Sequence, residues 1–305
     1  MKNVHAKSGA QEVSLASPGF VGEGQHPDRM PGHWVLARAD KRVLRPGGLE
    51  LTRRMLDALA IGPQDRVVEF APGLGVTARM VLQRHPLAYW GVEREPAAVE
   101  YLRQQLAGTP AEIVLAQAEE SGLPRSSATV VYGEAMLSMQ SQERKNRIFA
   151  EARRLLEAGG RYGIQELCLL PDSIPDRLRH EIQAAMSKDI HVGVQPLSRS
   201  EWVRLFERNG LKVTWSSEAP MHLLKPWRVL QDEGLRGGLR FAFKMATDRT
   251  IRRRIFAMRR LFHKYGEHLG AISLVGRRES DVPISDHHQG TEGSGLGRVP
   301  EGRDK

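Results

Sequence analysis

Residues Asp65–Leu82, with the sequence DRVVEFAPGLGVTARMVL, decide the fold of this chain. A short apolar, β-branched run that ends near Glu69 is followed by a glycine-rich turn and then by helix-forming residues. This order is typical of the strand, loop and helix start of a nucleotide-binding α/β fold. Gly73 and Gly75 have no side chain that would hold a ligand away from the backbone, and the helix start offers free N–H groups. We therefore expect a ligand to lie against main chain here.

The composition sets the limits for the rest of the chain. With 305 residues and 40% hydrophobic content, the chain can bury a substantial core, and one domain with insertions is favoured. No run approaches the roughly 18 apolar residues of a membrane helix, and residues 1–25 lack the apolar centre of a secretion signal. A single cysteine, Cys168, excludes an internal disulfide and a cysteine-rich zinc cluster. The sequence therefore predicts a soluble, cytoplasmic protein.

The chain is strongly basic, with a formal net charge of +9 and a pI near 9.9. Such a charge would suit a nucleic acid or another anionic partner. Much of the excess lies between Arg252 and Lys264, where Ile251, Ile255 and Met258 recur at helical spacing. This pattern predicts an amphipathic helix with a solvated basic face over about 249–264.

Short apolar runs alternate with helical patterns along the first half of the chain. A helix is predicted over 49–59, and further helices over 96–106 and 142–156. Strands are predicted over 65–70, 87–93, 113–116, 127–132 and 162–169. This alternation predicts an α/β fold with a doubly wound, Rossmann-like parallel sheet, whose ligands lie beyond the carboxyl ends of the strands.

The second half changes character. A helix is predicted over 172–186, another begins at the capping box of Ser198 and Glu201, and strands are predicted over 211–216 and 271–275. The stretch 217–269 is too long for a hairpin loop and contains helical patterns, so we expect a helical insertion over the ligand edge. The expected domain spans 32–278. Residues 1–31 and 279–305 are expected to be disordered because they are polar and lack apolar periodicity.

The second predicted strand also ends in a carboxylate, Glu93. It lies about 20 residues beyond the glycine turn, where a nucleoside-binding fold places the acid that binds the ribose hydroxyls. We therefore expect Glu93 to be part of the ligand site.

From Leu44 to Arg278 the chain resembles a class I methyltransferase that uses S-adenosylmethionine, of the small-molecule, methyltransferase type 11-like kind. Glu69, Ala71, Gly73 and Gly75 match the first motif of the family, with Ala71 in place of the commoner first glycine. Glu93 matches the acid at the end of the second strand. The resemblance implies S-adenosylmethionine as methyl donor and S-adenosylhomocysteine as product.

Two further segments carry the resemblance. The residues around Gln117 and Ala118 resemble the segment after the third strand, which usually places an aspartate toward the adenine amine, and here Gln117 takes that position. The segment Arg45–Gly48 with Thr52 resembles one that, in some small-molecule methyltransferases, covers the methionine end of the cofactor. The cofactor-binding residues that the resemblance implies are Gly48, Glu69, Ala71, Gly73, Gly75, Glu93, Arg94, Gln117, Ala118 and Glu134.

The glycine turn alone does not exclude other cofactors. Residues 73–78 also fit the G-x-G-x-x-A form of a nicotinamide site. The chain has no Tyr-x-x-x-Lys pair of the kind typical of short-chain dehydrogenases. Together with Glu69, Glu93 and Gln117, this absence favours the methyl donor, and a nicotinamide oxidoreductase is a distant alternative.

Three residues are candidates for catalysis: Glu134, at the end of the fourth strand, and His191 and His222 near the expected pocket mouth. Methyl transfer needs a general base only if the attacking atom carries a proton. No metal cluster is visible in the sequence, and we expect no metal cofactor, since the adjacent His287 and His288 lie in the predicted tail, where we expect them to be solvated.

The sequence favours a small-molecule acceptor, because it lacks the Asn/Asp-Pro-Pro-aromatic motif of many nucleic-acid amino-methyltransferases and the Pro-Cys motif of cytosine-C5 enzymes. We expect this acceptor to be largely apolar or aromatic. Trp202, Trp215 and Trp227 are candidates for the lining of its pocket, with core packing as the simpler alternative. The open alternatives are a methyltransferase for RNA or another nucleic acid that uses the basic face of 252–264, and a non-catalytic protein that binds S-adenosylmethionine. Nothing in the sequence indicates the oligomeric state.

Overall fold

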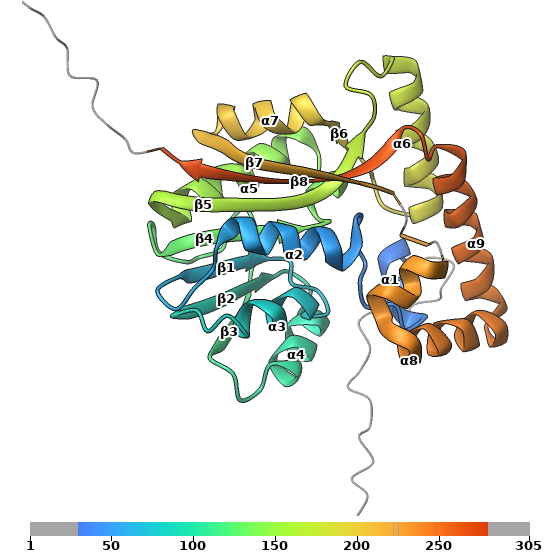
Figure 1. Ribbon diagram of the computed structural model, residues 1–305, viewed down its shortest axis with the longest axis horizontal. Coiled ribbons are helices and arrows are strands. Elements are labelled where there is room, and N and C mark those ends of the chain that lie inside the picture. Colours follow the sequence, from blue (N-terminus) through green and yellow to red (C-terminus); the bar gives the residue numbers. More distant parts are fainter. Residues whose placement is uncertain (1–29, 222, 225, 280–305) are drawn as a thin grey trace, which may run out of the picture.

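The computed structural model describes residues 30–279 except 222 and 225. The two predicted tails lie largely outside the described residues, apart from the short ends 30–31 and 279. One eight-stranded sheet forms the centre of the molecule, with helices on both faces and a group of helices at one end (Figure 1). The prediction of a doubly wound Rossmann-like sheet is confirmed.

The sheet is mixed, with the order β3-β2-β1-β4-β5-β8-β7 and a short β6 beside β5. Its strands are β1 (Arg66–Phe70), β2 (Ala88–Glu93), β3 (Ala111–Leu115), β4 (Ala128–Glu134), β5 (Leu156–Leu169), β6 (Leu197–Ser198), β7 (Leu211–Pro220) and β8 (Leu269–Arg278). Strands β1 to β5 run parallel, whereas β8 is antiparallel to both β5 and β7. The prediction of a wholly parallel sheet is therefore wrong at β8, which runs antiparallel to both of its neighbours.

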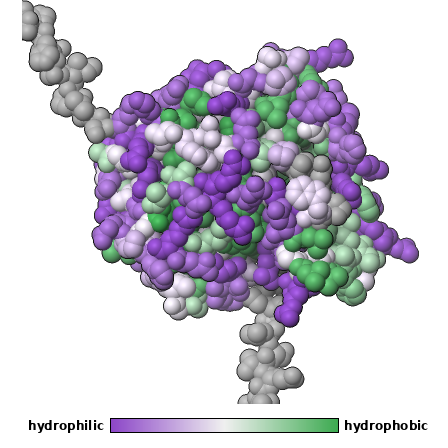
Figure 2. Space-filling view, in the orientation of Figure 1, coloured by the Kyte–Doolittle hydropathy of each residue, from purple (hydrophilic) through white to green (hydrophobic). Residues whose placement is uncertain are grey.

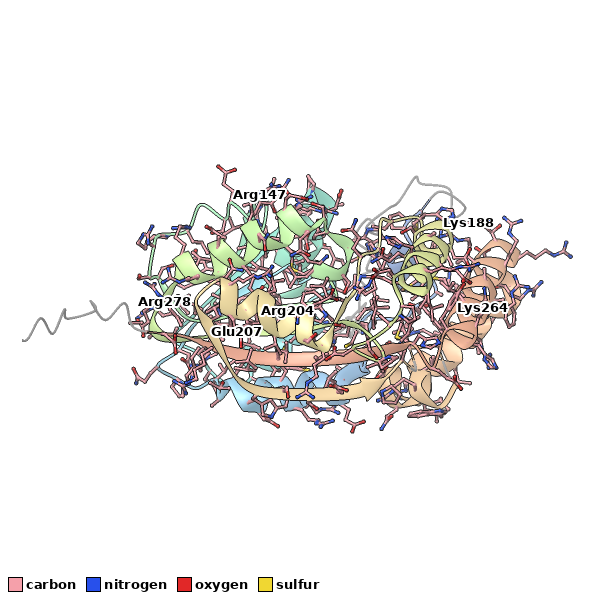
Figure 3. All side chains as sticks on the ribbon, turned by 90° about the horizontal axis from the view of Figure 1, so that it is seen from above. Arg147, Lys188, Arg204, Glu207, Lys264 and Arg278 are labelled. Atoms are coloured by element: carbon pink, nitrogen blue, oxygen red, sulfur yellow. The ribbon has the colours of Figure 1, made fainter. Side chains whose placement is uncertain are left out.

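The helices fall into three groups. One face of the sheet carries α2 (Gly48–Leu59), α3 (Val76–Leu82) and α4 (Pro96–Gln105), and the other carries α5 (Gln142–Leu155) and α7 (Arg199–Arg208). Figure 3 shows α5 and α7 on one side of the sheet and α2 on the other. A third group, beyond the end of the sheet, contains α1 (Gly32–Arg38), α6 (Asp176–Ile190), α8 (Pro226–Thr247) and α9 (Arg249–Lys264). A one-turn 3-10 helix, Leu137–Met139, follows β4.

The sequence pattern explains most boundaries. The α7 helix starts at the predicted capping box, in which Ser198 and Glu201 bond each other's backbone N–H groups. Strand β5 begins at Leu156, six residues earlier than the predicted 162, and the register with β4 shifts between Ala128 and Val130. Gly159 and Gly160 therefore lie in an irregular part of the strand, after α5 has ended at Leu155.

The α8–α9 pair is the predicted helical insertion. Because β7 and β8 are antiparallel neighbours, the segment between them lies at the carboxyl end of β7, which is the same sheet edge at which β1, β2 and β4 end. The helix α9 is amphipathic as predicted, but its basic face is not wholly solvated. Arg254 is 6% exposed and donates to the carbonyl oxygens of Met30 and Asp189. No helix among residues 30–279 is long and apolar enough to cross a membrane.

Candidate active site

A cavity of about 590 Å³ opens at the carboxyl edge of the parallel strands. This volume is in the range of small-molecule sites, about 300–1,000 Å³. One part of its lining comes from the turns after β1, β2, β3 and β4. The other part comes from α1, α6, α9 and the loops near them. The fold thus joins a polar half, made by the strand ends, to an apolar half, made by the helices of the third group.

The turns after β1 and β2 form the floor of the polar half. Ala71 and Gly73 line it, and the Glu93 carboxylate accepts hydrogen bonds from the backbone N–H groups of Arg94 at 2.9 Å, Glu95 at 3.1 Å and Gly73 at 3.4 Å. Burial raises the pKa of Glu93, while these backbone hydrogen bonds oppose the rise. Glu93 therefore ties the two turns together and still faces the cavity, with the exposed Arg94 beside it.

Glu69 lies deeper, at the end of β1. It is 3% exposed and lines the cavity, and its Oε2 accepts hydrogen bonds from the hydroxyl groups of both Tyr89 and Tyr132. Burial raises the pKa of Glu69 to about 7, against the effect of the two tyrosine hydrogen bonds. The sequence motif placed the acid correctly beside the cavity but contained no signal for its tyrosine partners.

Glu134, at the end of β4, is held from three sides. Its Oε1 accepts from the Thr52 hydroxyl at 2.6 Å and lies 3.2 Å from Arg45 Nε, while its Oε2 accepts from the Thr77 hydroxyl at 2.5 Å. Arg45 Nε also donates to the Thr52 hydroxyl oxygen at 2.8 Å. These contacts fix Glu134 in one orientation at the cavity wall.

Arg45 has an unused donor in this arrangement. The residue is 8% exposed and lines the cavity, and its Nη2 is buried with no hydrogen-bond partner in the described part of the chain. An unsatisfied buried guanidinium nitrogen is costly, so a ligand with an acceptor group is the expected partner. Of the predicted segment Arg45–Gly48, Arg45 and Pro46 line the cavity.

Gly48 and Gly75, which were predicted to bind the cofactor, do not line the cavity. A side chain at Gly75 would meet Leu102 of α4 at 2.9 Å. Gly48 has φ +62, and a Cβ atom there would lie 2.6 Å from the Asp232 carboxylate of α8. Only glycine fits that backbone and that approach without strain. Both glycines therefore position the neighbouring segments and do not face the cavity.

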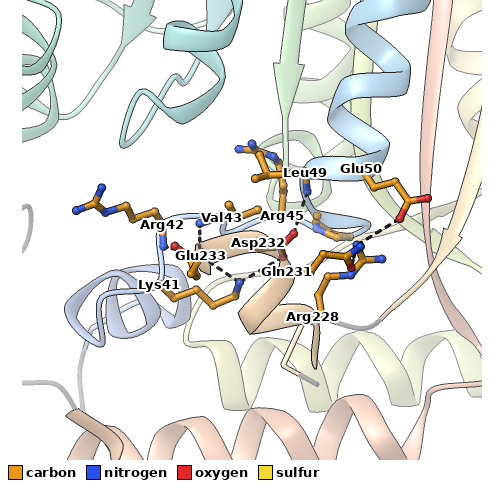
Figure 4. A network of polar contacts seen from close by, with 12 residues as sticks. Lys41, Arg42, Val43, Arg45, Leu49, Glu50, Arg228, Gln231, Asp232 and Glu233 are labelled. Carbon is orange, nitrogen blue, oxygen red and sulfur yellow. Dashed lines mark hydrogen bonds and ion pairs between the residues drawn. The ribbon is translucent and has the colours of Figure 1, made fainter. Parts of the chain in front are cut away.

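A polar network fastens the segment 41–49 from two directions. From the sheet, Gln165 Nε2 donates to the carbonyl oxygen of Pro46 at 2.6 Å. From α8, Glu233 accepts from the backbone N–H groups of Arg42 and Val43, both at 2.9 Å (Figure 4). The buried Lys41 lies 3.6 Å from Asp232 and 3.5 Å from Glu233. The helical insertion thus holds the segment that carries Arg45.

The segment after β3 contributes Gln117 and Ala118 to the lining. The Oε1 atom of the exposed Gln117 accepts from Arg144 Nη2 at 2.5 Å, and Arg144 also forms an ion pair with Glu119, with 2.7 Å from Nε to Oε1. The amide oxygen that we expected to face an adenine amine is therefore already bound by α5. Gln117, Glu119 and Arg144 all line this end of the cavity and make it polar.

The other half of the cavity is lined mainly by aliphatic, aromatic and methionine side chains. They come from α1, the turn after β4, α6, the segment before α8, and α9, and include Trp34, Leu36, Leu44, Met139, Met186, Ile190, Val194, Met221, Leu223, Met258 and Phe262. The buried Glu166 borders this half, where its carboxylate accepts from the backbone N–H groups of Met136, Leu137 and Ser138. The tryptophans Trp202, Trp215 and Trp227 do not line the cavity.

His33 was missed as a site residue because its sequence surroundings have no periodicity. It lines the cavity, its ring lies 4.8 Å from that of Trp34, and its Nδ1 is buried without a hydrogen-bond partner among the described residues. Burial, together with the nearby positive charge of Arg94, lowers the pKa of His33 to about 4. The imidazole is therefore neutral at physiological pH.

The two histidines proposed from the sequence are placed differently. His191 is exposed, ends α6 with a left-handed backbone, lies 3.2 Å (Nδ1) from Arg254 Nη1, and is not among the cavity-lining residues. Its position does not favour a catalytic role. His222 lies outside the described residues, as do His287 and His288. Within the described ranges, no cluster of three or more His, Cys, Asp or Glu side chains could hold a metal ion.

Comparisons with known proteins agree with this geometry. Residues 67–160 match the family model of a methyltransferase domain. An uncharacterized protein of Haemophilus influenzae is 29% identical over 213 residues, which cover 68% of this chain and 83% of that protein.

Solved methyltransferases share the fold. Geranyl diphosphate C-methyltransferase from Streptomyces coelicolor A3(2), in complex with Mg²⁺, geranyl diphosphate and S-adenosylhomocysteine, has a TM-score of 0.55 and 16% identity, with 75% of this chain and 79% of that chain covered. Phosphoethanolamine N-methyltransferase 2 from Haemonchus contortus has a TM-score of 0.62 and 12% identity, with 86% and 60% covered. Residues 67–160 thus match a methyltransferase domain, and the fold is the one that solved S-adenosylmethionine-dependent methyltransferases share, which together support methyltransferase activity.

Proposed function

We propose that this enzyme methylates a small, largely apolar or aromatic acceptor bound in the helical half of the cavity. The observation that carries the proposal is the apolar lining contributed by α1, α6 and α9, which continues directly from the strand-end half. Geranyl diphosphate, which one structural neighbour binds, is an acceptor of partly apolar character. The proposed catalytic domain spans 32–278, with the insertion 217–269 covering the acceptor.

In the polar half of the cavity, separate residues would bind the ribose, the methionine portion and the adenine of S-adenosylmethionine. Glu93 accepts from the ribose hydroxyls, because it lines the cavity and its Oε2 accepts only one backbone hydrogen bond, the long one from Gly73 at 3.4 Å. Arg45 donates from Nη2 to the carboxylate of the methionine portion, since this nitrogen lacks another partner among the described residues. Gln117 and Ala118 border the adenine, and Ala71 and Gly73 lie against the nucleoside.

The cofactor supplies an electrophilic methyl group on a sulfonium, so the chain mainly aligns the acceptor and excludes water. Glu134, already engaged by Arg45, Thr52 and Thr77, orients the Arg45 guanidinium and is a positioning residue. His33 contacts the acceptor. Its neutral imidazole can accept a proton or a hydrogen bond at Nδ1 if the attacking atom carries one.

Two measurements test the proposal in sequence. Calorimetry with S-adenosylhomocysteine tests the cofactor half, and absence of binding by folded protein would refute it. Incubation with methyl-labelled S-adenosylmethionine and a metabolite extract then tests the acceptor class, and we expect the label in the organic-soluble fraction. Label transferred to RNA instead would show that the acceptor proposal is wrong, while cofactor binding without transfer to any fraction would indicate a non-catalytic binding protein.

A further inference from the structure

The second half of α8 exposes a row of large apolar side chains. Leu235, Leu239 and Phe243 are 71%, 62% and 65% exposed. They recur every four residues, so they lie along one ridge of the helix. Figure 2 shows hydrophobic atoms with hydrophilic atoms beside them at the lower right of the molecule, where Figure 1 places α8.

The same helix already buries a different apolar side. Phe241 and Met245 pack against the core formed by α1, α6 and α9, and Gly237 is buried on the same ridge. Two residues correspond to about 200° around a helix, so the exposed ridge points away from the core. A surface helix that only completes a fold places polar residues on that side. Core packing therefore does not explain Leu235, Leu239 and Phe243.

Positive charge surrounds the exposed ridge. Arg236, Arg240 and Lys244 follow directly after the three apolar residues, and all three are exposed. Between residues 234 and 264 the chain has ten arginine and lysine residues and one acid, Asp248, which is used to cap α9 by accepting from the N–H groups of Thr250 and Ile251. Phe256 on α9 is a further exposed apolar side chain of the insertion, 46% exposed.

The orientation of the ridge is fixed relative to the active site. Gly234 has φ 70 and ψ 177, a conformation almost restricted to glycine, and breaks α8 into two parts. The first part is anchored through Asp232 and Glu233 to the segment around Lys41. The second part packs on α9, whose inner residues Met258 and Phe262 line the acceptor half of the cavity.

We propose that this surface, formed by Leu235, Leu239 and Phe243 with Arg236, Arg240 and Lys244, docks on an anionic lipid surface. The apolar side chains enter the boundary between headgroups and acyl chains, and the basic side chains contact lipid phosphates. A nucleic acid would account for the basic residues but gives no role to three exposed aliphatic and aromatic side chains on one ridge. The inference concerns a surface outside the cavity and stands independently of the proposed acceptor.

Vesicle pelleting of the full chain tests the proposal. Vesicles of phosphatidylcholine with about one third phosphatidylglycerol are compared with pure phosphatidylcholine, at low salt and at about 0.3 M salt. We expect pelleting with the anionic vesicles, weakened by salt, and little with the neutral ones. The triple variant Leu235→Ser, Leu239→Ser, Phe243→Ser should reduce binding about tenfold or more, because all three side chains leave the lipid boundary.

Matched controls separate docking from misfolding. Leu87→Ser changes a similarly exposed leucine, 63% exposed, before β2, and should leave pelleting unchanged. S-adenosylhomocysteine affinity should be the same in the triple variant and the wild type, so failure of docking and failure of the cofactor site are distinguished. No pelleting, equal pelleting with neutral vesicles, RNA binding that the triple variant retains, or a wild-type dimer that the triple variant abolishes would each overturn the proposal.

Discussion

Arg45 Nε lies 3.2 Å from Glu134 Oε1, which joins the loop before α2 to the end of β4 across the mouth of the cofactor half. Thr52 reinforces the pair, because its hydroxyl oxygen lies within hydrogen-bond distance of both side chains. Because the guanidinium group is planar, a carboxylate that holds Nε also restricts the position of Nη2. The relationship therefore prepares Arg45 Nη2 for an anionic group of a ligand.

Replacing Arg45 by alanine should weaken S-adenosylhomocysteine binding roughly 10- to 100-fold, since a hydrogen bond to a charged group contributes about 1.5–3 kcal/mol. Calorimetry measures the loss. The same variant should bind 5′-methylthioadenosine, which lacks the amino-acid group, as well as the wild type does. Arg204→Ala, at an exposed position of α7 (Figure 3), is the matched control and should change neither affinity. Equal losses for both ligands would contradict the assigned partner.

Glu93→Gln should weaken S-adenosylhomocysteine binding about tenfold, because the amide is a weaker acceptor for the ribose hydroxyls. Glutamine keeps an acceptor for the backbone N–H groups of Arg94 and Glu95 and loses only the long hydrogen bond from the Gly73 N–H at 3.4 Å. The analogue that lacks the 2′-hydroxyl provides the second arm of a double-mutant cycle. It should bind the wild type more weakly than the natural product but show little difference between wild type and variant. If Glu93→Gln weakened binding of the analogue as much as it weakened binding of the natural product, Glu93 would not be the partner of the 2′-hydroxyl group.

His33→Phe should leave S-adenosylhomocysteine affinity within about twofold of the wild type if His33, which belongs to α1 and lines the cavity, contacts the acceptor and not the cofactor. Turnover with the acceptor found in the labelling screen should fall about 100-fold if the imidazole accepts a proton from it. His33→Gln, which retains a hydrogen-bond acceptor, separates orientation from proton transfer. Unchanged turnover in both variants would remove His33 from the acceptor site.

Local pattern was sufficient to predict the sheet and the acids at its edge. The strand periods around Val67 and Tyr89 placed Glu69 and Glu93 at neighbouring strand ends, and in parallel strands those ends meet. A motif of this kind spans few residues, so composition and spacing determine it. Eight of the ten residues proposed for the cofactor lie at the cavity, and the exceptions are the packing glycines Gly48 and Gly75.

The parts of the site that the sequence did not indicate depend on contacts between residues far apart in the chain. The contact between Arg42 N and Glu233 joins residues 191 positions apart, and no period or spacing encodes it. The polar residues Gln165 and Glu166, which interrupt the apolar second half of β5, were a usable signal, because a buried carboxylate or amide needs partners. His33 carried no such signal, since its role depends on α1 folding back over the sheet edge.

Glu69 should make the protein less stable as pH rises toward neutrality. Its pKa is about 7 in the folded protein, against 4.5 for the ordinary side chain, so the folded state binds more protons between these pH values. Its stabilising contribution is therefore present below about pH 4.5 and is lost as pH rises to about 7, by up to about 3 kcal/mol. Urea unfolding should show that the free energy of unfolding of the wild type falls, relative to that of Glu69→Gln, as the pH rises across this range. A pH-independent difference would contradict the raised pKa.

Gly48→Ala should destabilise the protein by about 2–4 kcal/mol, because the substitution strains a backbone with positive φ and brings a Cβ atom 2.6 Å from the Asp232 carboxylate. Since Asp232 Oδ1 also accepts from the Leu49 N–H at 3.2 Å, relief of the clash would break the contact between α2 and α8. Urea unfolding measures the change. Gly62→Ala is the matched control, as a Cβ atom added there would meet no atom of the described residues within 4 Å and its φ is not positive, so its free energy of unfolding should be nearly unchanged. If Gly48→Ala unfolds like Gly62→Ala but binds S-adenosylhomocysteine more weakly, Gly48 contacts the cofactor and its assignment as a packing glycine is wrong.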